Sequence, residues 1–368
     1  MKTTTSINPE LLARYEALKS EQPKLRIRNA AEALGVSEME LLELQLGSTA
    51  TRLSGGWQSL LQEVESLGHV MALTRNEYVV HERKGVYHNV SFMHDGKMGV
   101  AVNPDIDLRL FMWEWEYGYA VEVPSRGKVL HSLQFFNQRG AAVHKIYLTN
   151  KSDKAAYDAL VTKYRAGDQG TPATVDHSPQ AAPTVIPDSE IDVAAFQEEW
   201  RKLQDTHDFF PLLKKYELQR TQALRLAPEG FTQKVPNEAV VKVLEAAAEN
   251  EVPIMVFVNS PGCIQIHTGP VKKLIPMEQW FNVMDPDFNL HLNLEGIAES
   301  WVVKKPTKDG IVTGLEVYDA QGELIVYFFG KRKPGIPELE SWREIIDEKF
   351  DPACLRMAGR SAGVEATI

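Results

Sequence analysis

Apolar side chains in residues 8–47 recur every three or four positions, the period of one face of an α-helix. Pro23 interrupts this pattern, and Gly35 interrupts it again just before Ser37, a residue type that caps helices. The pattern predicts a layer of short helices. Its turn resembles that of a DNA-binding helix-turn-helix, but the three glutamates that follow Ser37 within six residues are poorly suited to DNA phosphates. We favour a helical layer packed on a larger domain, with DNA binding as the remote alternative.

The pattern changes between about residues 69 and 149, where short runs rich in Val, Tyr and Phe alternate with turn sequences. Consecutive short strands joined by tight turns predict an antiparallel meander, and a helix over residues 152–165 closes this half. Trp113 and Trp115 alternate along one of the predicted strands, and we assign both to the core.

Residues 166–190 show no apolar period and are rich in Gly, Pro, Ser and Thr. This composition predicts a mobile linker. It divides the chain into a first domain of residues 1–165 and a second domain of residues 191–368.

The two domains repeat one pattern. Residues 103–110 (Asn-Pro-Asp-Ile-Asp-Leu-Arg-Leu) align with residues 285–292 (Asp-Pro-Asp-Phe-Asn-Leu-His-Leu), an offset of 182. The same offset pairs Gly140 with Gly322 at the end of a predicted hairpin turn. One spacing that holds without a gap from position 103 to 140 indicates an internal duplication. We therefore expect an α+β fold built from two equivalent units that pack as pseudo-symmetric partners. Upstream of position 103 the register of the repeat is not set by the pattern.

Composition narrows the function. The 368 residues carry a formal net charge of −10, which argues against a general nucleic-acid binder. The first six residues have no apolar run after their charge, and no run approaches the roughly twenty apolar residues that cross a bilayer. Two distant cysteines suggest neither a disulfide nor a metal site. We expect a protein of the reducing cytoplasm.

His207 is the first candidate for chemistry. It follows Asp205 and Thr206, which suit a helix start, and precedes Phe209 and Phe210. An imidazole at the end of an element, beside aromatic rings, could hold the iron of a flat apolar ligand with two carboxylates. The alternative is a structural histidine that continues the helical stripe of Phe196, Trp200 and Leu203 into the core.

Cationic residues follow His207 in the sequence. Arg220 and Arg225 follow on the next segment, and Lys331, Arg332 and Lys333 follow the last strand of the second repeat. Guanidinium groups match carboxylates geometrically.

In the first repeat, Arg109 and Phe111 share one face of a predicted strand, an arrangement that suits a pocket wall. The second repeat has His291 and Asn293 at the equivalent positions. Alone, this pair would be interpreted as a surface arginine beside a core phenylalanine.

Together, these motifs resemble a known family. Residues 206–213 (Thr-His-Asp-Phe-Phe-Pro-Leu-Leu), residues 222–227 (Gln-Ala-Leu-Arg-Leu-Ala) with Arg220, residues 107–111 (Asp-Leu-Arg-Leu-Phe) and the duplication are similar to the HemS/ChuS/PhuS-like proteins. These are cytoplasmic haem-transport and haem-degrading proteins of Gram-negative bacteria. The resemblance extends from the N-terminal helices to about residue 350.

The resemblance implies two large antiparallel sheets flanked by helices, with haem in a cleft beside the second half. His207 would be the proximal iron ligand, and Arg109 and Phe111 would lie on the distal side. The remaining expected contacts lie around the propionates, the pocket rim and the ring: Arg220, Lys305, Arg332 and Phe257. The family's further histidines after the ligand are missing, because Asp208, Phe209 and Phe210 follow here.

The function implied is acceptance of imported haem, and two activities stay open. An enzyme would open the macrocycle and release iron, with Arg109 in a catalytic role. Since the chain has no dinucleotide-binding fingerprint, it would need an external electron donor. A carrier would instead deliver intact haem. Expected partners are a haem importer, a downstream oxygenase or reductase, and a second copy of the chain.

Overall fold

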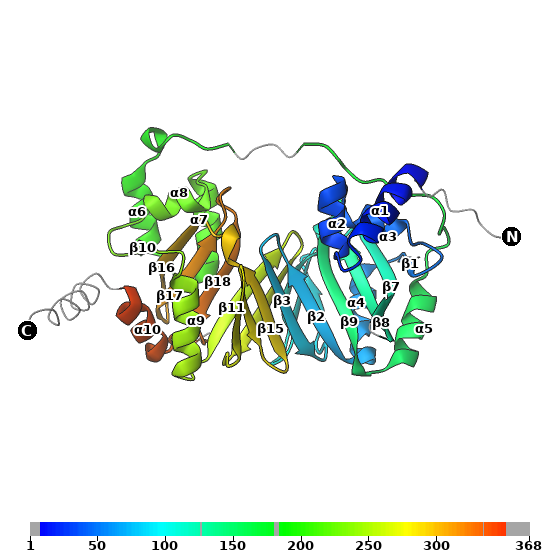
Figure 1. Ribbon diagram of the computed structural model, residues 1–368. Helices are drawn as coiled ribbons and strands as arrows, with labels where there is room; N and C mark the ends of the chain where they lie inside the picture. The colour runs from blue at the N-terminus through cyan, green and yellow to red at the C-terminus, as the bar shows by residue number, and fades with distance from the viewer. Residues whose placement is uncertain (1–7, 126, 180–183, 334, 351–368) are drawn as a thin grey trace, which may run out of the picture. The chain divides into compact units, whose positions relative to one another are not determined.

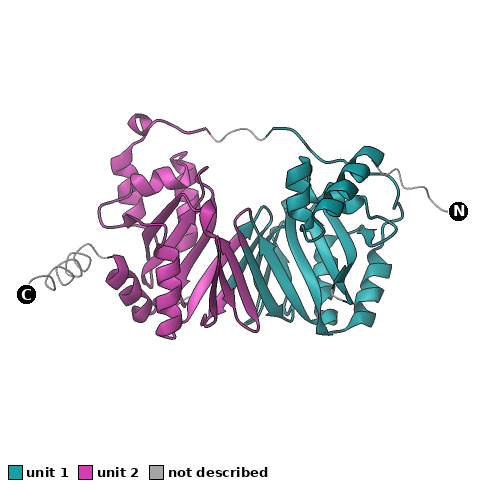
Figure 2. Cartoon of the chain, in the orientation of Figure 1, with its two compact units in different colours: residues 1–76, 80–179, 259–266 teal, residues 77–79, 180–258, 267–368 magenta. Residues whose placement is uncertain are grey.

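The computed structural model describes residues 8–125, 127–179, 184–333 and 335–350. The chain forms two compact units (Figure 2). Unit 1 consists of residues 1–76, 80–179 and 259–266, and unit 2 of residues 77–79, 180–258 and 267–368. Each unit therefore includes a short segment from the other half of the sequence.

The first half runs through helices and strands in an order that the second half repeats (Figure 1). Its elements are α1 (Pro9–Glu21), α2 (Ile27–Leu34), α3 (Glu38–Glu43), β1 (Ala50–Leu53), α4 (Trp57–Glu63), η1 (Val64–Leu67), β2 (Gly68–Arg75), β3 (Val79–Gly85), β4 (Ser91–Met93), β5 (Met98–Val102), β6 (Asp107–Phe111), η2 (Met112–Glu114), β7 (Tyr117–Ser125), β8 (Lys128–Phe136), β9 (Ala142–Ser152) and α5 (Lys154–Tyr164).

The second half begins after the connecting segment, residues 165–187. Its elements are η3 (Asp188–Glu190), α6 (Val193–Arg201), η4 (Thr206–Asp208), α7 (Phe209–Lys215), α8 (Arg220–Arg225), β10 (Thr232–Val235), α9 (Ala239–Glu249), β11 (Ile254–Ser260), β12 (Cys263–Gly269), β13 (Leu274–Met277), β14 (Trp280–Met284), β15 (Phe288–Asn293), η5 (Leu294–Gly296), β16 (Glu299–Thr307), β17 (Gly310–Tyr318), β18 (Leu324–Gly330) and α10 (Glu340–Phe350).

The strands form two large antiparallel sheets flanked by helices, which confirms the predicted fold class. Within unit 1, β1, β7, β8, β9, β2 and β3 are neighbours in this order, and β4, β5, β6 and the start of β12 form a second series. Within unit 2, β10, β16, β17, β18 and β11 follow the same plan, and β13, β14 and β15 form the second series.

The offset of 182 extends well upstream of position 103. It relates the first residues of α3 and α8, of β1 and β10, and of β5 and β14, as well as those of β7 and β16. Between these elements β3 and β12 begin 184 residues apart, at Val79 and Cys263. The second half thus has two more residues than the first before β12, and two fewer between β12 and β14. This explains why a gapless comparison of the sequence could not follow the repeat there.

Helices cover both faces of the long sheet in unit 1. Ala120 of β7 packs in a cluster with α4 and α5, while its neighbours Tyr119 and Val121 pack in another with Met39 and Leu42 of α3. The alternation follows from the period of two along a strand. Since α3 buries its apolar side chains on the sheet, it is a packing helix, as the preferred interpretation of residues 8–47 predicted.

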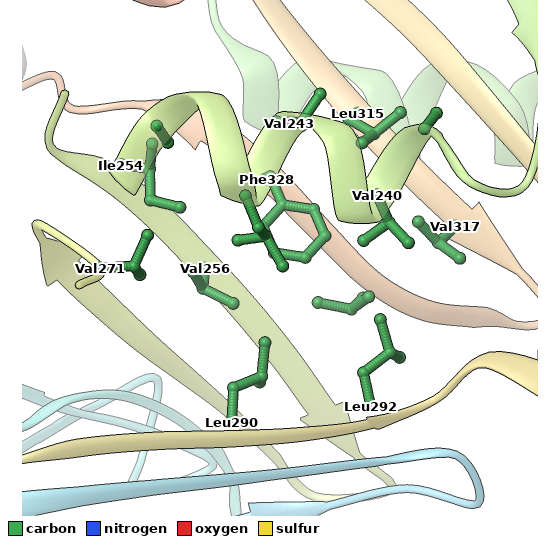
Figure 3. Packing of buried hydrophobic residues seen from close by; sticks show 14 of the residues in the cluster. Val240, Val243, Ile254, Val256, Val271, Leu290, Leu292, Leu315, Val317 and Phe328 are labelled. Carbon is green, nitrogen blue, oxygen red and sulfur yellow. The ribbon is translucent and has the colours of Figure 1, made fainter. Parts of the chain in front are cut away.

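The largest apolar cluster of unit 2 lies between α9, α10 and the sheet. In Figure 3, Val240 and Val243 of α9 face Val256 and Phe328 of the strands. These four side chains are fully buried. The opposite face of β16 packs against α6 and α7 through a separate cluster. The helix that follows the candidate ligand is thereby attached to a rigid sheet.

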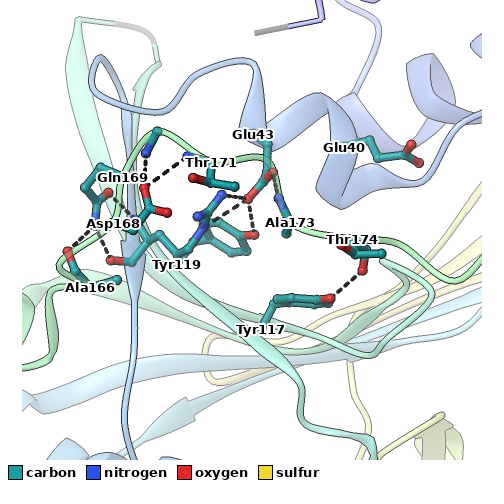
Figure 4. Close-up of polar contacts among 12 residues, drawn as sticks. Glu40, Glu43, Tyr117, Tyr119, Ala166, Asp168, Gln169, Thr171, Ala173 and Thr174 are labelled. Atoms are coloured by element: carbon teal, nitrogen blue, oxygen red, sulfur yellow. Dashed lines mark hydrogen bonds and ion pairs between the residues drawn. The ribbon is translucent and has the colours of Figure 1, made fainter. Parts of the chain in front are cut away.

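The segment after α5 packs against the rest of unit 1, although it has no regular structure up to Pro179. Gln169 hydrogen-bonds the backbone of Arg52 through both amide atoms, and the Ala173 N–H donates to the Glu43 carboxylate at 2.7 Å (Figure 4). Glu43 also pairs with Arg52 and accepts from Tyr119. Residues 180–183 of the predicted linker lie outside the described residues, and its mobility stays a prediction.

The sequence interpretation of the two tryptophans after β6 is wrong for one of them. Trp113 and Trp115 follow β6 in the 3₁₀ turn η2 and at its end, where strand alternation no longer applies. Trp115 is buried and donates to the Gly262 carbonyl at 2.9 Å, whereas Trp113 is 61% exposed. Only one of the two tryptophans belongs to the core.

Glu338 makes a testable contribution to stability. Its carboxylate is buried and accepts the Thr313 N–H at 2.8 Å. Burial raises its pKa from 4.5 to about 7, against the opposing effect of the backbone donors and two arginines. The folded protein thus keeps a proton between pH 4.5 and 7 that the unfolded chain releases, so the stability present below pH 4.5 is lost as the pH rises through 7.

Glu338→Gln should remove this pH dependence of the free energy of unfolding. For a pKa shift of this size the dependence amounts to on the order of 3 kcal/mol between pH 4.5 and 7. The free energy of unfolding in urea, measured from pH 4.5 to 8, checks this. Glu340→Gln, an exposed neighbour, is the matched control and should keep the wild-type slope. An unchanged slope in Glu338→Gln would contradict the assignment.

Candidate haem site

The turn that carries His207 is built by two aspartates. Asp205 caps η4 and accepts the His207 N–H at 2.9 Å, while the Asp208 carboxylate accepts the Asp205 N–H at 3.0 Å. This reciprocal capping satisfies donors that a helix start leaves open. The short turn then continues into α7, whose Phe209 and Leu212 are buried. The backbone of this segment is therefore held while the imidazole points away from the core.

His207 is 87% exposed, so it is not the structural histidine of the alternative interpretation. The apolar stripe of Phe196, Trp200 and Leu203 is buried, but α6 ends at Arg201 and the imidazole does not continue it. The Nδ1 atom lies 2.6 Å from Asp205 Oδ1. No hydrogen bond to Nε2 occurs within the described part of the chain. The geometry presents that nitrogen outward.

Phe209 connects this turn to two cations. The Lys305 ammonium lies 4.4 Å from the centre of the Phe209 ring, and the Arg220 guanidinium lies 5.4 Å from it. A cation above an aromatic face is attracted by the ring's quadrupole. Arg220 is the first residue of α8, and Lys305 belongs to β16, the strand beside η4.

A buried carboxylate holds both cations. Arg220 donates to Glu316 through Nε at 3.0 Å and Nη2 at 2.9 Å, and Lys305 Nζ donates at 2.6 Å. The Tyr318 hydroxyl donates to the same carboxylate and accepts from Arg220 Nε at 2.9 Å. Glu316 is fully buried, Lys305 is 4% exposed and Arg220 is 26% exposed. Arg220 is thus the member of the network that reaches solvent.

The pKa values follow from burial and from this pairing. Burial alone would raise the pKa of Glu316, but Arg220 and Lys305 outweigh it and hold that pKa well below its usual range. Burial lowers the pKa of Lys305 to about 8, with Glu316 opposing the shift and Arg220 adding to it. Glu316 stays ionised, and Lys305 changes charge near pH 8.

Aromatic rings extend the same face of the sheet. Antiparallel register places Glu316 opposite Tyr327, and Tyr327 opposite Phe257 on β11. The Phe257 and Tyr327 rings stack with centres 4.7 Å apart, and Phe329 meets both edge-on. Arg220 also lies over the Tyr327 ring. This face combines flat apolar surfaces with a charged end.

Arg332 lies in the segment after β18 and acts electrostatically on Asp205, the residue that caps η4. Burial by itself would raise the pKa of Asp205, but its hydrogen bonds with His207 and the nearby charges of His207 and Arg332 lower it. Arg332 also acts on Glu338. Arg332 is half-buried and therefore suits a position at the rim.

Arg109 and Phe111 lie together on β6 of unit 1. Their half-buried side chains alternate with the buried Leu108 and Leu110, which confirms the shared face. Arg109 pairs with Asp107 and donates to the Leu108 carbonyl at 3.1 Å, and the Phe111 ring lies 5.2 Å from that of Trp113. The distal role of both residues stays a prediction.

Unit 2 thus gathers most of the predicted site. Arg220, Lys305 and Phe257 share one network of contacts, which Phe209 joins to the turn of His207. Sequence reasoning missed Glu316, Tyr318 and Tyr327. A signal for Glu316 existed, because a lone acid within Leu-Glu-Val-Tyr on a predicted strand implies a buried charge with partners.

The family can be assigned from comparison with known proteins. A model of the haemin-degrading HemS.ChuX domain matches the chain twice, at residues 35–164 and 217–349, which together span more than half of it. The chain belongs to the HemS.ChuX family. The two matches begin 182 residues apart, the offset of the internal repeat.

Full-length relatives agree. The chain is 38% identical over 341 residues to the hemin transport protein HmuS of Yersinia pestis, covering 92% of this chain and 97% of the relative. The crystal structure of holo-PhuS, a heme-binding protein from Pseudomonas aeruginosa, has a TM-score of 0.88 at 49% identity and covers 91% and 97% of the two chains. ChuS, an E. coli heme oxygenase, has a TM-score of 0.82 at 35% identity and covers 92% and 99%.

Among the described residues, no helix is long and apolar enough to span a membrane.

Proposed function

We propose that this protein binds haem and that His207 is the protein's ligand to the iron, through Nε2. The observation that carries this proposal is the exposed imidazole whose other nitrogen is already engaged by Asp205 at 2.6 Å. A haem ligand needs this arrangement, because the partner of one nitrogen sets the tautomer and leaves the other as the metal-binding atom. Relatives described as hemin transport and heme-binding proteins support the choice of ligand.

The residues around His207 suit the rest of a haem molecule. The rings of Phe257 and Tyr327 offer flat apolar contacts, and Arg220 and Lys305 offer cations for the propionates. Arg332 would meet carboxylate at the rim. Arg109 and Phe111 are proposed for the distal side of the ring, where a guanidinium could stabilise negative charge at the open face of the iron.

Bound haem supplies redox iron, and two uses of it follow. As an enzyme, the protein would open the macrocycle with O₂ and an external electron donor and release iron. As a carrier, it would pass haem intact from an importer to a separate oxygenase. Its relatives include both a heme oxygenase and hemin transport proteins. A cytoplasmic location and a homodimer belong to the same proposal.

Turnover separates the two uses. Haem-loaded protein is given ascorbate or a reductase, with catalase present because free peroxide destroys haem without an enzyme. Loss of the Soret band together with release of iron and an open-chain product would show that the protein is a haem-degrading enzyme. A Soret band that persists assigns the carrier.

His207→Ala should weaken hemin binding at least about ten-fold, since even loss of a residue that supports a metal ligand commonly costs that much. It should also shift the Soret band. Titration with hemin, followed in the visible spectrum, measures both. His177→Ala removes another exposed histidine, located in the connecting segment, and should behave as wild type. If His207→Ala kept the wild-type spectrum and affinity, another residue would be the ligand.

Arg109→Ala should change the visible bands that report the open position of the ferric iron, while hemin affinity falls by less than about five-fold. The physical reason is that Arg109 is proposed to act on that position and not on the propionates. Arg83→Ala, another arginine of unit 1 that pairs with an aspartate, is the control. A large loss of affinity without spectral change would overturn the distal role.

A further inference from the structure

We propose that the chain between the two halves is a strap that the same two positions of a repeated short helix hold in each unit, and that its hold on α8 is coupled to haem binding. The strap consists of the connecting segment and η3, described over residues 165–179 and 184–190. The coupling rests on the proposed function, because it takes haem as the ligand of unit 2. It adds that haem binding tightens residues 184–188 on α8.

The two helix positions lie three residues apart, and therefore on one face of each helix. At the offset of 182, Glu40 and Glu43 of α3 correspond to Gln222 and Arg225 of α8. All four side chains contact the strap. A connection without a defined path would have no reason to meet the same two positions in both copies of the helix. The repeated contact indicates that the path of the strap is built into the duplicated fold.

In unit 1 the two helix positions are acids. Glu43 accepts the Ala173 N–H at 2.7 Å (Figure 4). Glu40 Oε1 lies 3.2 Å from His177 Nε2. The first anchor of the strap therefore spans residues 173–177, and it holds the second turn of α3.

In unit 2 the helix positions are an amide and a base, and the acid belongs to the strap. Gln222 Nε2 donates to the Ile186 carbonyl and to Asp188 Oδ1, both at 2.7 Å. Arg225 Nη1 donates to Asp188 Oδ2 at 3.1 Å. Gln222 is 3% exposed, and both acceptors of its amide nitrogen lie on the strap. Because a buried amide that loses its partners is costly, Gln222 favours the conformation in which the strap is bound.

The short helix α8 joins this second anchor to the candidate haem site. It has six residues, from Arg220 to Arg225. A helix of this length is not stable alone, so its position depends on the contacts of its side chains. Arg220 is proposed to meet the ligand, and Gln222 lies two residues further along. The strap therefore favours the position of Arg220 that the ligand needs, and by reciprocity a ligand on Arg220 strengthens the hold of the strap.

Limited proteolysis of the full-length wild-type chain tests the coupling directly. Thermolysin cuts before exposed apolar residues, and Val185, which is 58% exposed, lies beside the second anchor. Saturating hemin should slow the cut before Val185 at least about five-fold. The cut before Val175, within the first anchor, is the internal reference and should change by less than about two-fold. Mass spectrometry of the fragments identifies both cuts.

Asp188→Asn weakens the second anchor, because an amide replaces the carboxylate that Gln222 and Arg225 share. The cut before Val185 in the haem-free protein should become at least about five-fold faster, and hemin affinity should fall about three-fold or more. Reciprocity sets a limit, since this loss of affinity should not exceed the protection that hemin gives the wild type. Glu190→Gln removes the same charge from an exposed position of the same 3₁₀ turn and should behave as wild type.

Tyr117→Phe loosens the first anchor instead, because the Tyr117 hydroxyl donates to the Thr174 carbonyl. It should speed the cut before Val175 and leave hemin affinity within about two-fold of the wild type. This variant separates a hold on α8 from a general loosening of the strap. Thermal unfolding of each variant verifies folding, and protection by hemin is measured on the wild type, so it needs no variant.

The outcomes separate the two proposals. If hemin binds the wild-type chain but leaves the cut before Val185 at its original rate, the coupling is wrong while haem binding through His207 stands. Wild-type affinity in Asp188→Asn, or an equal loss in Tyr117→Phe, would overturn the coupling as well. Failure of the wild-type chain to bind hemin would overturn the proposed function, and the coupling with it.

Discussion

The candidate site depends on one buried ion cluster. Glu316 lies within a strand whose neighbouring side chains are all buried, and such a charge is tolerated only with partners that satisfy both oxygens. Those partners come from β16, from the first residue of α8 and from Tyr318 on the same strand. The cluster therefore fixes where α8 starts on the sheet, and with it the preceding helix and the turn of His207. An interaction that places cations for a ligand also positions the metal-binding imidazole.

The duplicated scaffold carries different chemistry in its two copies. At the offset of 182, Arg220 corresponds to Glu38 and Tyr327 to Lys145. In unit 1, Glu38 and Lys145 form a buried ion pair in which the helix residue is the acid, whereas in unit 2 the helix residue, Arg220, is the base. Lys145 and Arg75 overcome the effect of burial and lower the pKa of Glu38 to about 2. His207 corresponds to Leu25, and Glu316 to Gln134. The same helix start and strand thus meet through charges in both copies, and each cluster pairs one carboxylate with two cations. The copies differ at the position of His207, where the first has the apolar Leu25.

Each unit also needs a segment from the other half of the sequence. Cys263 packs in the core of unit 1, where its thiol lies near Thr74, and Val79 packs in the core of unit 2. Cutting the chain within the connecting segment would remove residues 259–266 from the unit that they complete. Each compact unit therefore combines residues from both sides of residues 166–190. The division of the chain into two domains at that segment stays a prediction.

Local pattern alone determined much of this protein. Strand alternation and turn sequences predicted an antiparallel α+β fold, because these signals act over a few residues, and the constant offset of 182 between the two halves predicted an internal repeat. Capping residues likewise predicted the helix start beside His207, and the motifs predicted the family. Tertiary structure decided what has no local signal. It showed that His207 is exposed instead of continuing a buried stripe, and that Trp113 leaves the core once the strand ends. It also joined Arg220 to Glu316, 96 residues further along the chain, on the hairpin of β16 and β17 that brings Lys305 to the same carboxylate. Whether a charged residue faces solvent, a ligand or a buried counter-ion depends on such pairing, and no period along the chain records it.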